Sequence, residues 1–216
     1  MASPESSNSL TDTKARLLDA AERLFARAGI AATSMRAVTA EAEANVAAVH
    51  YHFGSKGELL RAVFERRIAP VNEERLKRLD DLEAAGRGPS VDALVEALVR
   101  PALEFASRHP GLSELVGLLQ AEPADEVGAL FEEVFAETIE RFTAALARAL
   151  PELDEETLHA RYGFAIGAMV AVITHRGPFA TDPAKVIPDL VRFLSAGMKA
   201  PAAPSIASAV PTRETP

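Results

Sequence analysis

The segment 34–56, SMRAVTAEAEANVAAVHYHFGSK, constrains the fold more than any other part of this 216-residue chain. Each of its halves has apolar or small residues at the i, i+3, i+4, i+7 spacing of a helix with one buried face. The residues of the two faces are Met35, Val38, Thr39 and Ala42 in the first half, then Val46, Val49 and Phe53 in the second. The pattern therefore predicts two short helices, over 35–42 and 46–53.

Only residues 43–45 remain to connect these two helices. Two helices joined by three residues must cross steeply, as they do in a helix-turn-helix. Ser34 stands just before the first helix, where its hydroxyl can cap free backbone N–H groups. We therefore predict a helix-turn-helix over about residues 34–53, with an ordinary helical hairpin in a bundle as the alternative.

The rest of the chain also has helical periodicity, and the alternation of β-branched residues that marks strands is absent. A long helix begins at Ser55, and Pro70 should kink it or end its first part. Asp154 should cap the helix that follows it. The other predicted helices cover about residues 11–28, 90–108, 111–120, 124–150, 155–174 and 182–198. The fold is predicted to be all-α, with about nine helices.

Composition narrows the classes of function. The chain has no cysteine, which excludes disulfides, thiolate zinc sites and thiol catalysis. Its N-terminal sequence lacks the basic start and apolar run of a signal peptide. The longest apolar stretch, residues 162–173, is short of the roughly 20 residues that cross a bilayer. These features predict a cytoplasmic protein with no membrane partner.

Charge is distributed unevenly along the chain. The formal net charge is −8, yet residues 10–67 contain nine Lys and Arg against seven acidic residues. A slightly basic head on an acidic body can be held against DNA in one orientation, because phosphate repels the body.

No catalytic, cofactor or metal site is predicted. His109, His159 and His175 have no second ligand at a recognised spacing, so we interpret all three as non-ligands. The sequence has no identifiable nucleophile with a base and no glycine-rich phosphate loop. We therefore expect that the protein is not an enzyme, although a hydrolase on a helical scaffold is a third hypothesis.

The arrangement resembles the TetR family of bacterial transcriptional regulators. The resemblance lies in ARLLDAAERLFARAGIAATSMRAV at 15–38, in Ala47 and Ala48, and above all in YHFGSKGELL at 51–60. It implies a DNA-binding domain over 10–54 and a ligand-binding and dimerisation domain over 55–199. A flexible N-terminus over 1–9 and a disordered tail over 200–216 complete the predicted organisation.

The resemblance also implies a function. The implied function is transcriptional repression by a homodimer, which binds a palindromic double-stranded DNA operator and is released from it by a small effector. The alternative is a small-ligand binding protein whose DNA-reading head is weakened or lost, which Glu43 and the net acidity would favour.

Family positions suggest which residues contact DNA. Thr33 and Ser34 would contact phosphate, Arg36 would reach phosphate or a base edge, and Lys56 would clamp a phosphate. The recognition helix would present Asn45, Val46, Ala47 and Ala48 to base edges, with His50 and Tyr51 against the backbone or bases. This base-reading face is small and mostly apolar, so it can meet thymine methyls but forms few hydrogen bonds with bases.

Two positions depart from the family pattern. Glu43 stands in the turn where the family usually has Gly, and a left-handed backbone there would strain a residue with a side chain. His50 stands where Tyr is common, and a neutral imidazole can still donate one hydrogen bond to phosphate.

Apolar residues of the second domain suggest an effector pocket, and the effector is expected to be apolar or aromatic. Ordinary core packing is the alternative for each of them. The candidate pocket residues are Phe105, Phe131, Phe135, Phe142, Phe164 and Met169.

The predicted helix over 162–173 is apolar around its whole circumference, which indicates a helix that is covered on all sides. It can form a two-fold, four-helix interface with the helix over 182–198, or it can be the buried central helix of a monomer. We favour the dimer, because two small heads need pairing to bind DNA tightly.

Overall fold

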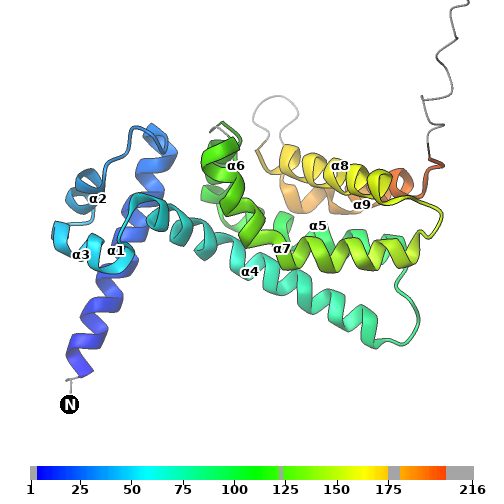
Figure 1. Cartoon of the computed structure of the whole chain (residues 1–216), viewed down its shortest axis with the longest axis horizontal. Helices are drawn as coiled ribbons and strands as arrows, with labels where there is room; N and C mark the ends of the chain where they lie inside the picture. Colours follow the sequence, from blue (N-terminus) through cyan, green and yellow to red (C-terminus); the bar gives the residue numbers. More distant parts are fainter. Residues whose placement is uncertain (1–3, 122–123, 175–180, 203–216) are drawn as a thin grey trace, which may run out of the picture.

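The computed structural model describes residues 4–121, 124–174 and 181–202, and these residues form helices and connections with no strand. This confirms the predicted all-α class (Figure 1). In order, the elements are α1 (Pro4–Ala28), α2 (Met35–Glu41), α3 (Val46–Phe53), α4 (Lys56–Ala84), α5 (Val91–Arg108), α6 (Pro110–Ala121), α7 (Ala124–Ala149), α8 (Glu155–Thr174), the 3₁₀ helix η1 (Pro183–Val186) and α9 (Ile187–Lys199).

The helices form a head and a body joined by α4 (Figure 1). Helices α1, α2 and α3 make up the head, and α5 to α9 make up the body. The long helix α4 packs against α1 and α3 at one end and against α5 and α7 along the rest of its length. It therefore belongs to both parts.

The core of the head comes from the apolar faces that the sequence predicts. Phe25 of α1 is fully buried, and Val38, Val49 and Phe53 pack into the same cluster from α2 and α3. An isolated helix of seven or eight residues is not stable in water, so α2 and α3 depend on the burial of these faces. The same packing holds the two helices at a fixed crossing.

Two helix boundaries differ from the sequence prediction, and α4 shows that one of the two outcomes predicted for Pro70, the end of a helix, does not occur. Helix α1 begins at Pro4, so residues 4–9, which were expected to be flexible, are helical. A helix nucleated by the buried turns of α1 extends readily toward its N-terminus, because propagation costs much less than nucleation. Helix α4 continues through Pro70 without ending, since Ile68 and Val71 on either side are buried. The predicted helix over 182–198 is divided into η1 and α9, with Pro188 in the first turn of α9.

The structure describes only part of the predicted C-terminal tail. Residues 203–216, most of the predicted disordered tail, lie outside the described residues.

Asp154 caps α8 as predicted, since its Oδ1 accepts a hydrogen bond of 2.7 Å from the Thr157 N–H. The same hydrogen bond lowers the pKa of Asp154.

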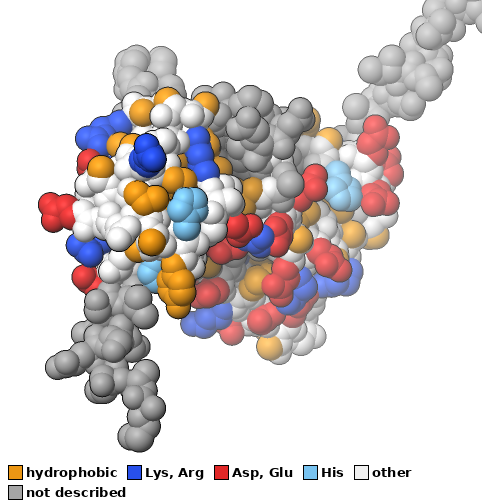
Figure 2. Space-filling model, turned by 60° about the vertical axis from the view of Figure 1, so that its left-hand side comes forward, with side chains coloured by type: hydrophobic (Ala, Val, Ile, Leu, Met, Phe, Trp, Pro, Cys, Tyr) orange, Lys and Arg blue, Asp and Glu red, His pale blue; other side chains and the backbone are white. Residues whose placement is uncertain are grey.

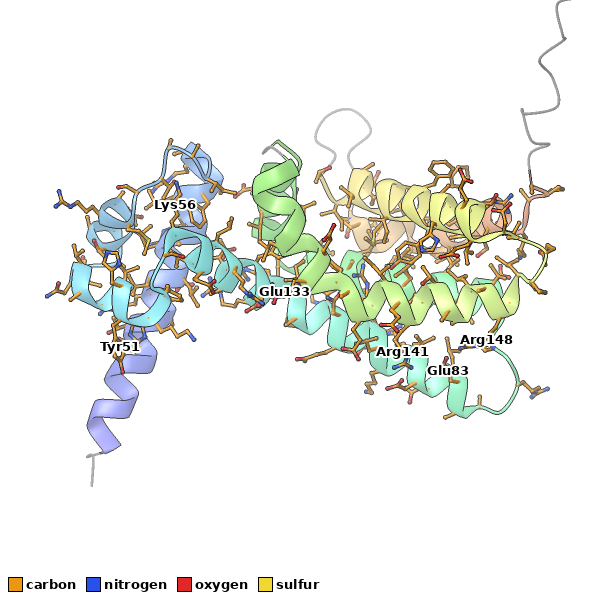
Figure 3. The ribbon with its side chains drawn as sticks, in the orientation of Figure 1. Tyr51, Lys56, Glu83, Glu133, Arg141 and Arg148 are labelled. Carbon is orange, nitrogen blue, oxygen red and sulfur yellow. The ribbon has the colours of Figure 1, made fainter. Side chains whose placement is uncertain are left out.

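Polar contacts fasten α4 to α7 along much of the body (Figure 3). Arg61 pairs with Glu133, Arg141 bridges to Asp80 at 2.7 Å and to Glu83 at 2.8 Å, and Arg148 also pairs with Glu83. In the interior, the Asn72 Nδ2 donates to the Val134 carbonyl at 3.0 Å. The exposed pairs are individually weak, but together they fix the register of the two helices.

The turn between α2 and α3 has a left-handed residue at Glu43, whose φ is 49°. The Ala44 N–H donates to the Thr39 carbonyl at 2.9 Å and the Glu43 N–H donates to the Ala40 carbonyl at 3.2 Å. This is the hydrogen-bonding pattern of a Schellman cap, in which the left-handed position is usually Gly. Glu43 therefore carries the strain that the sequence comparison anticipated.

We predict that Glu43→Gly stabilises the chain by about 1 kcal/mol, because it relieves the strain of a left-handed residue with a Cβ. Urea unfolding followed by circular dichroism measures this change. Glu43→Ala is the matched control, since it removes the charge but keeps the Cβ. Equal stabilisation by both variants would show that the charge, and not the backbone, is the cause.

Candidate nucleic-acid interface

Helix α3 is amphipathic and turns one face away from the head. Val49 and Phe53 are buried, whereas Val46, Ala47, His50 and Tyr51 are exposed. Ala48 is half-buried. The exposed face therefore contains four of the five predicted α3 residues, the cap Asn45 is exposed as well, and the buried face fixes the orientation of the helix.

Side-chain caps fix the starts of α2, α3 and α4, the three helices that build this surface. The Ser34 Oγ accepts from the Ala37 N–H at 3.1 Å, and the Asn45 Oδ1 accepts from the Ala47 N–H at 2.9 Å. Ser55 caps α4 in the same way. Asn45 was predicted to read bases, and its amide Nδ2 keeps that ability because the cap uses only the oxygen.

Tyr51 is the most exposed large side chain of the surface, with 76% of it accessible. It projects from α3 near the end of the helix (Figure 3), and its ring meets His52 edge-on at 5.2 Å between centroids. A phenol held this way can donate to phosphate while its ring covers a sugar or a base.

Lys56 stands at the first turn of α4 (Figure 3), where its Nζ donates to the Ala31 carbonyl at 3.1 Å. This bond joins the start of α4 to the loop between α1 and α2. An ammonium group has three donors, so two remain for a phosphate oxygen. Lys56 therefore stabilises the head through one hydrogen bond and still has donors with which to bind an anion.

The position of His50 corrects an expectation about its hydrogen bonding. Its Nδ1 lies 3.0 Å from the Gly54 carbonyl, which can only accept, so Nδ1 must carry the hydrogen. A neutral His50 then presents only the acceptor Nε2 to DNA. The ring can donate to a phosphate only when it is protonated, contrary to the expectation from the sequence.

Thr33 does not occupy the predicted place at the surface. The residue is 4% exposed, and its hydroxyl donates to the Gly29 carbonyl at 2.8 Å. The hydroxyl satisfies the carbonyl at the end of α1 instead of facing a phosphate. Thr33 and Ser34 are adjacent and both have a hydroxyl group. The sequence alone does not indicate which of the two hydroxyls points into the protein.

Basic side chains surround a largely uncharged face of the head, and acidic side chains are more frequent on the body (Figure 2). Arg36 is exposed and forms no ion pair with another described residue. Arg23 and Arg27, by contrast, both pair with Glu41, at 3.2 and 3.4 Å. Sequence reasoning missed Lys14, whose Nζ lies 6.0 Å from the centroid of the Phe53 ring, because α1 and α3 are far apart in sequence.

The described residues among the predicted pocket residues lie in different surroundings. Phe142 is fully buried in the core, Phe135 packs edge-on against Phe64, and Phe105 stacks on His109 at 4.0 Å. Phe164 is 72% exposed, so it does not line an internal pocket. The side chain of Phe131 lies outside the described residues. Met169 is buried and accepts from Arg75.

A cleft of about 190 Å³ lies elsewhere, where α1, α4 and α6 meet. Charged residues such as Asp19, Glu22 and Arg67 line much of it, which does not suit the predicted apolar effector. Within the described part of the chain, no cluster of three His, Asp or Glu side chains could hold a metal ion. His159 bonds to the Glu155 carbonyl, and His175 lies outside the described residues.

We predict that Thr33→Val and Ser34→Ala have different effects on the head. Thr33→Val should lower the free energy of unfolding by about 1 kcal/mol, because the Gly29 carbonyl loses its buried partner. Its affinity for DNA should change no more than stability explains. Ser34→Ala should weaken DNA binding as well as the cap. Fluorescence anisotropy with labelled DNA, beside urea unfolding, separates the two effects.

Comparison with known proteins gives two family matches. Residues 17–63 match the family described as "Bacterial regulatory proteins, tetR family". Residues 96–197 match "Tetracyclin repressor-like, C-terminal domain". The two matches cover the head and most of the body.

Curated relatives are similar over parts of the chain. An HTH-type transcriptional repressor of Streptomyces coelicolor is 33% identical over 104 residues, which are 48% of this chain and 47% of the relative. An HTH-type nicotine-responsive transcriptional repressor of Paenarthrobacter nicotinovorans is 43% identical over 54 residues, 25% of this chain and 28% of the relative. The match to these two thus spans half or less of their length. An HTH-type transcriptional repressor of Mycobacterium tuberculosis is 28% identical over 162 residues, 68% of this chain and 81% of the relative.

Solved structures share the fold at low sequence identity. A fatty acid degradation regulator from Bacillus halodurans has a TM-score of 0.65 at 15% identity, over 87% of this chain and 96% of that one. The repressor of a Stenotrophomonas maltophilia multidrug efflux pump has a TM-score of 0.64 at 22% identity, over 86% and 91%. A Bacillus subtilis regulator in complex with stearoyl-CoA has a TM-score of 0.63 at 11% identity, over 84% and 97%.

Proposed function

We infer that this chain, which belongs to the TetR family of bacterial transcriptional regulators, binds DNA through the exposed face of α3 and regulates transcription. The observation that carries this inference is the exposed tyrosine near the end of a rigidly packed recognition helix, which the capped start of α4 with Lys56 follows in the chain. The family is one of regulators and not of enzymes. The repressor names of the curated relatives support a repressing role, and a repressor acts on DNA in the cytoplasm.

We further propose that the protein acts as a homodimer through α8 and α9. Phe164 of α8 and Phe193 of α9 are 72% and 71% exposed, which is unusual for phenylalanine on a monomer's surface. Gly163 and Gly167 are also exposed, and a Cβ at either would meet nothing within 4 Å. Nothing in the described part of the protomer requires these glycines, whereas a second helix packed closely across them would.

Helix α8 also has the length and composition of a membrane span, which is weak evidence for one. One of its faces packs into the body, with Leu158, Tyr162, Ala165, Met169 and Ile173 buried. A helix that is fixed in the body by one face and has glycine and phenylalanine on the other fits a protomer interface better than a bilayer.

Two heads related by a two-fold axis would place two α3 helices in successive major grooves, roughly 34 Å apart or a small multiple of that. A palindromic operator has the matching symmetry. A small apolar or aromatic effector would release the DNA by binding the body in a state with a different head spacing, with a coupling of about 1–3 kcal/mol. The names of a nicotine-responsive relative and of a structural neighbour in complex with stearoyl-CoA support such an effector.

A ligand-binding protein with a weakened head is the second candidate. Glu43 is exposed in the turn beside α3, and a carboxylate there repels phosphate. Effector binding without any salt-dependent DNA binding would favour this candidate over the regulator.

We predict that Tyr51→Ala and Lys56→Met each weaken binding to the DNA upstream of the chain's own gene about tenfold or more, because each loses a phosphate contact. Lys56→Met should also reduce the slope of log affinity against log salt by about one. A mobility-shift titration at several salt concentrations measures both. Lys77→Met, on the exposed side of α4 in the body, is the control and should bind like the original chain. If the two head variants also bind like the original chain, α3 is not the DNA-binding element.

Phe164→Glu is predicted to convert the dimer into monomers, because it places a charge in an apolar interface. Sedimentation equilibrium measures the mass, and DNA affinity should fall with it. Ile139→Glu is the matched control, since Ile139 is an exposed apolar residue on α7. A Phe164→Glu variant with unchanged mass would place the interface elsewhere.

A further inference from the structure

Arg75 of α4 is buried in the body without a negative partner. The residue is 2% exposed. Its Nε donates to the Leu98 carbonyl at 2.7 Å, its Nη1 to the Asn72 Oδ1 at 3.1 Å, and its Nη2 to the Met169 Sδ at 3.3 Å. These acceptors are all uncharged, and no carboxylate of the described residues pairs with the guanidinium. Buried charges in proteins are almost always paired.

A structural role explains the hydrogen bonds of Arg75 but not its charge. The hydrogen bond from Nε to the Leu98 carbonyl joins α4 to α5 in the interior of the body. A donor at the Leu98 carbonyl is therefore useful, yet a neutral amide could supply it. Burial lowers the pKa of Arg75 to about 10, which leaves the group charged at neutral pH. The positive charge needs a separate explanation.

The donors of Arg75 suit a carboxylate. A guanidinium has five N–H donors, and three are used, so one hydrogen remains on each terminal nitrogen. Two such hydrogens can bind the two oxygens of one carboxylate. Met169 is a flexible side chain whose sulfur is a weak acceptor, so it can move aside to admit the ligand at low cost.

The surroundings of the guanidinium suit a single charge on an apolar molecule. Leu98 and Met169 are buried beside it. Tyr162 is also buried, and burial raises the pKa of its phenol, so the phenol stays neutral and supplies no counter-charge. One cation in an apolar setting matches a monoanion better than a phosphate with two charges.

We propose that Arg75 binds the carboxylate of an apolar monocarboxylic acid, and that this acid is the effector of the regulator. The proposal rests on the function proposed above and narrows its effector from apolar molecules in general to acids. Binding displaces the Met169 sulfur and shifts α8 relative to α4. Because Arg75 is part of α4, the ligand acts directly on the helix that carries the head.

Isothermal titration calorimetry of the full chain tests the proposal with two acids, decanoate and 2-naphthoate, each below its aggregation limit. Their neutral amides, decanamide and 2-naphthamide, are the matched ligands. At least one acid should bind, and about 50-fold more tightly than its amide, because only the anion neutralises the buried charge. Failure of both acids to bind, or equal binding of an acid and its amide, overturns the proposal.

Variants identify the residue responsible. Arg75→Met should lose about the same 50-fold in affinity for the acid while its affinity for the amide stays the same. Arg78→Met is the control: Arg78 lies one turn along α4, pairs with Glu74 at the surface and should bind the acid like the original chain. Arg75→Gln keeps neutral donors for the Leu98 carbonyl, so it covers the case in which Arg75→Met does not fold. Acid binding that survives in Arg75→Gln overturns the assignment.

Mobility shifts with the same proteins separate this proposal from the proposed function. DNA binding that acids do not alter, together with no acid binding, leaves the regulator standing and removes the Arg75 site. Acid binding through Arg75 in a chain that binds no DNA keeps the site and removes the regulator. Release of DNA by the acid in the original chain but not in Arg75→Gln supports both.

Discussion

The structure depends on α4 being one continuous helix that is shared by two parts of the molecule. At its start, Arg66 binds Asp19 at 2.8 Å and Glu22 at 2.7 Å, and Arg67 binds the same Glu22 at 2.7 Å, so α1 is held to it by three ion pairs. Glu22 has only 12% of its side chain exposed, so these contacts are shielded from water better than typical surface pairs. A rigid connection at this point is needed if a change in the body is to move the head.

The proposed DNA-reading surface has little means of reading bases directly. Val46, Ala47 and Ala48 offer only apolar contact, and Asn45 spends its oxygen on a cap. Affinity then has to come mainly from phosphate contacts, and these do not depend on sequence. In the proposed dimer, selectivity would depend on the spacing of two heads and on the shape of the DNA between them. The proposed dimer would therefore be as important for choosing an operator as the recognition helix.

The sequence predicted the fold well because helical periodicity and short connections determine local structure. Helices α2 and α3 of the head begin at their predicted positions, since Ser34 and Asn45 are strong caps. Glu43 stands where the family usually has Gly, which predicted strain if the backbone there is left-handed, and the backbone does have a positive φ.

The directions of individual side chains were harder to predict. Thr33 and Ser34 are adjacent hydroxyls with opposite orientations, and Phe164 and Met169 lie on opposite faces of α8 because they are five residues apart on a helix with 3.6 residues per turn. Only the packing of α8 against the other helices of the body, α5, α6 and α7 among them, determines which of the two faces is internal. The buried charge of Arg75 was missed for the same reason, since its position in the sequence resembles the other arginines of α4.

The head and the body are connected through α4, and they also contact each other at Glu22, where α6 packs against α1. A Cβ on Gly111, at the start of α6, would lie 3.2 Å from the Glu22 Oε1, so α6 rests directly against the carboxylate that binds Arg66 and Arg67. A shift of α4 changes the geometry of those ion pairs, and a shift of α6 presses on the same side chain. Both routes from the body therefore converge on one residue of α1, and the orientation of the head depends on the two helices together.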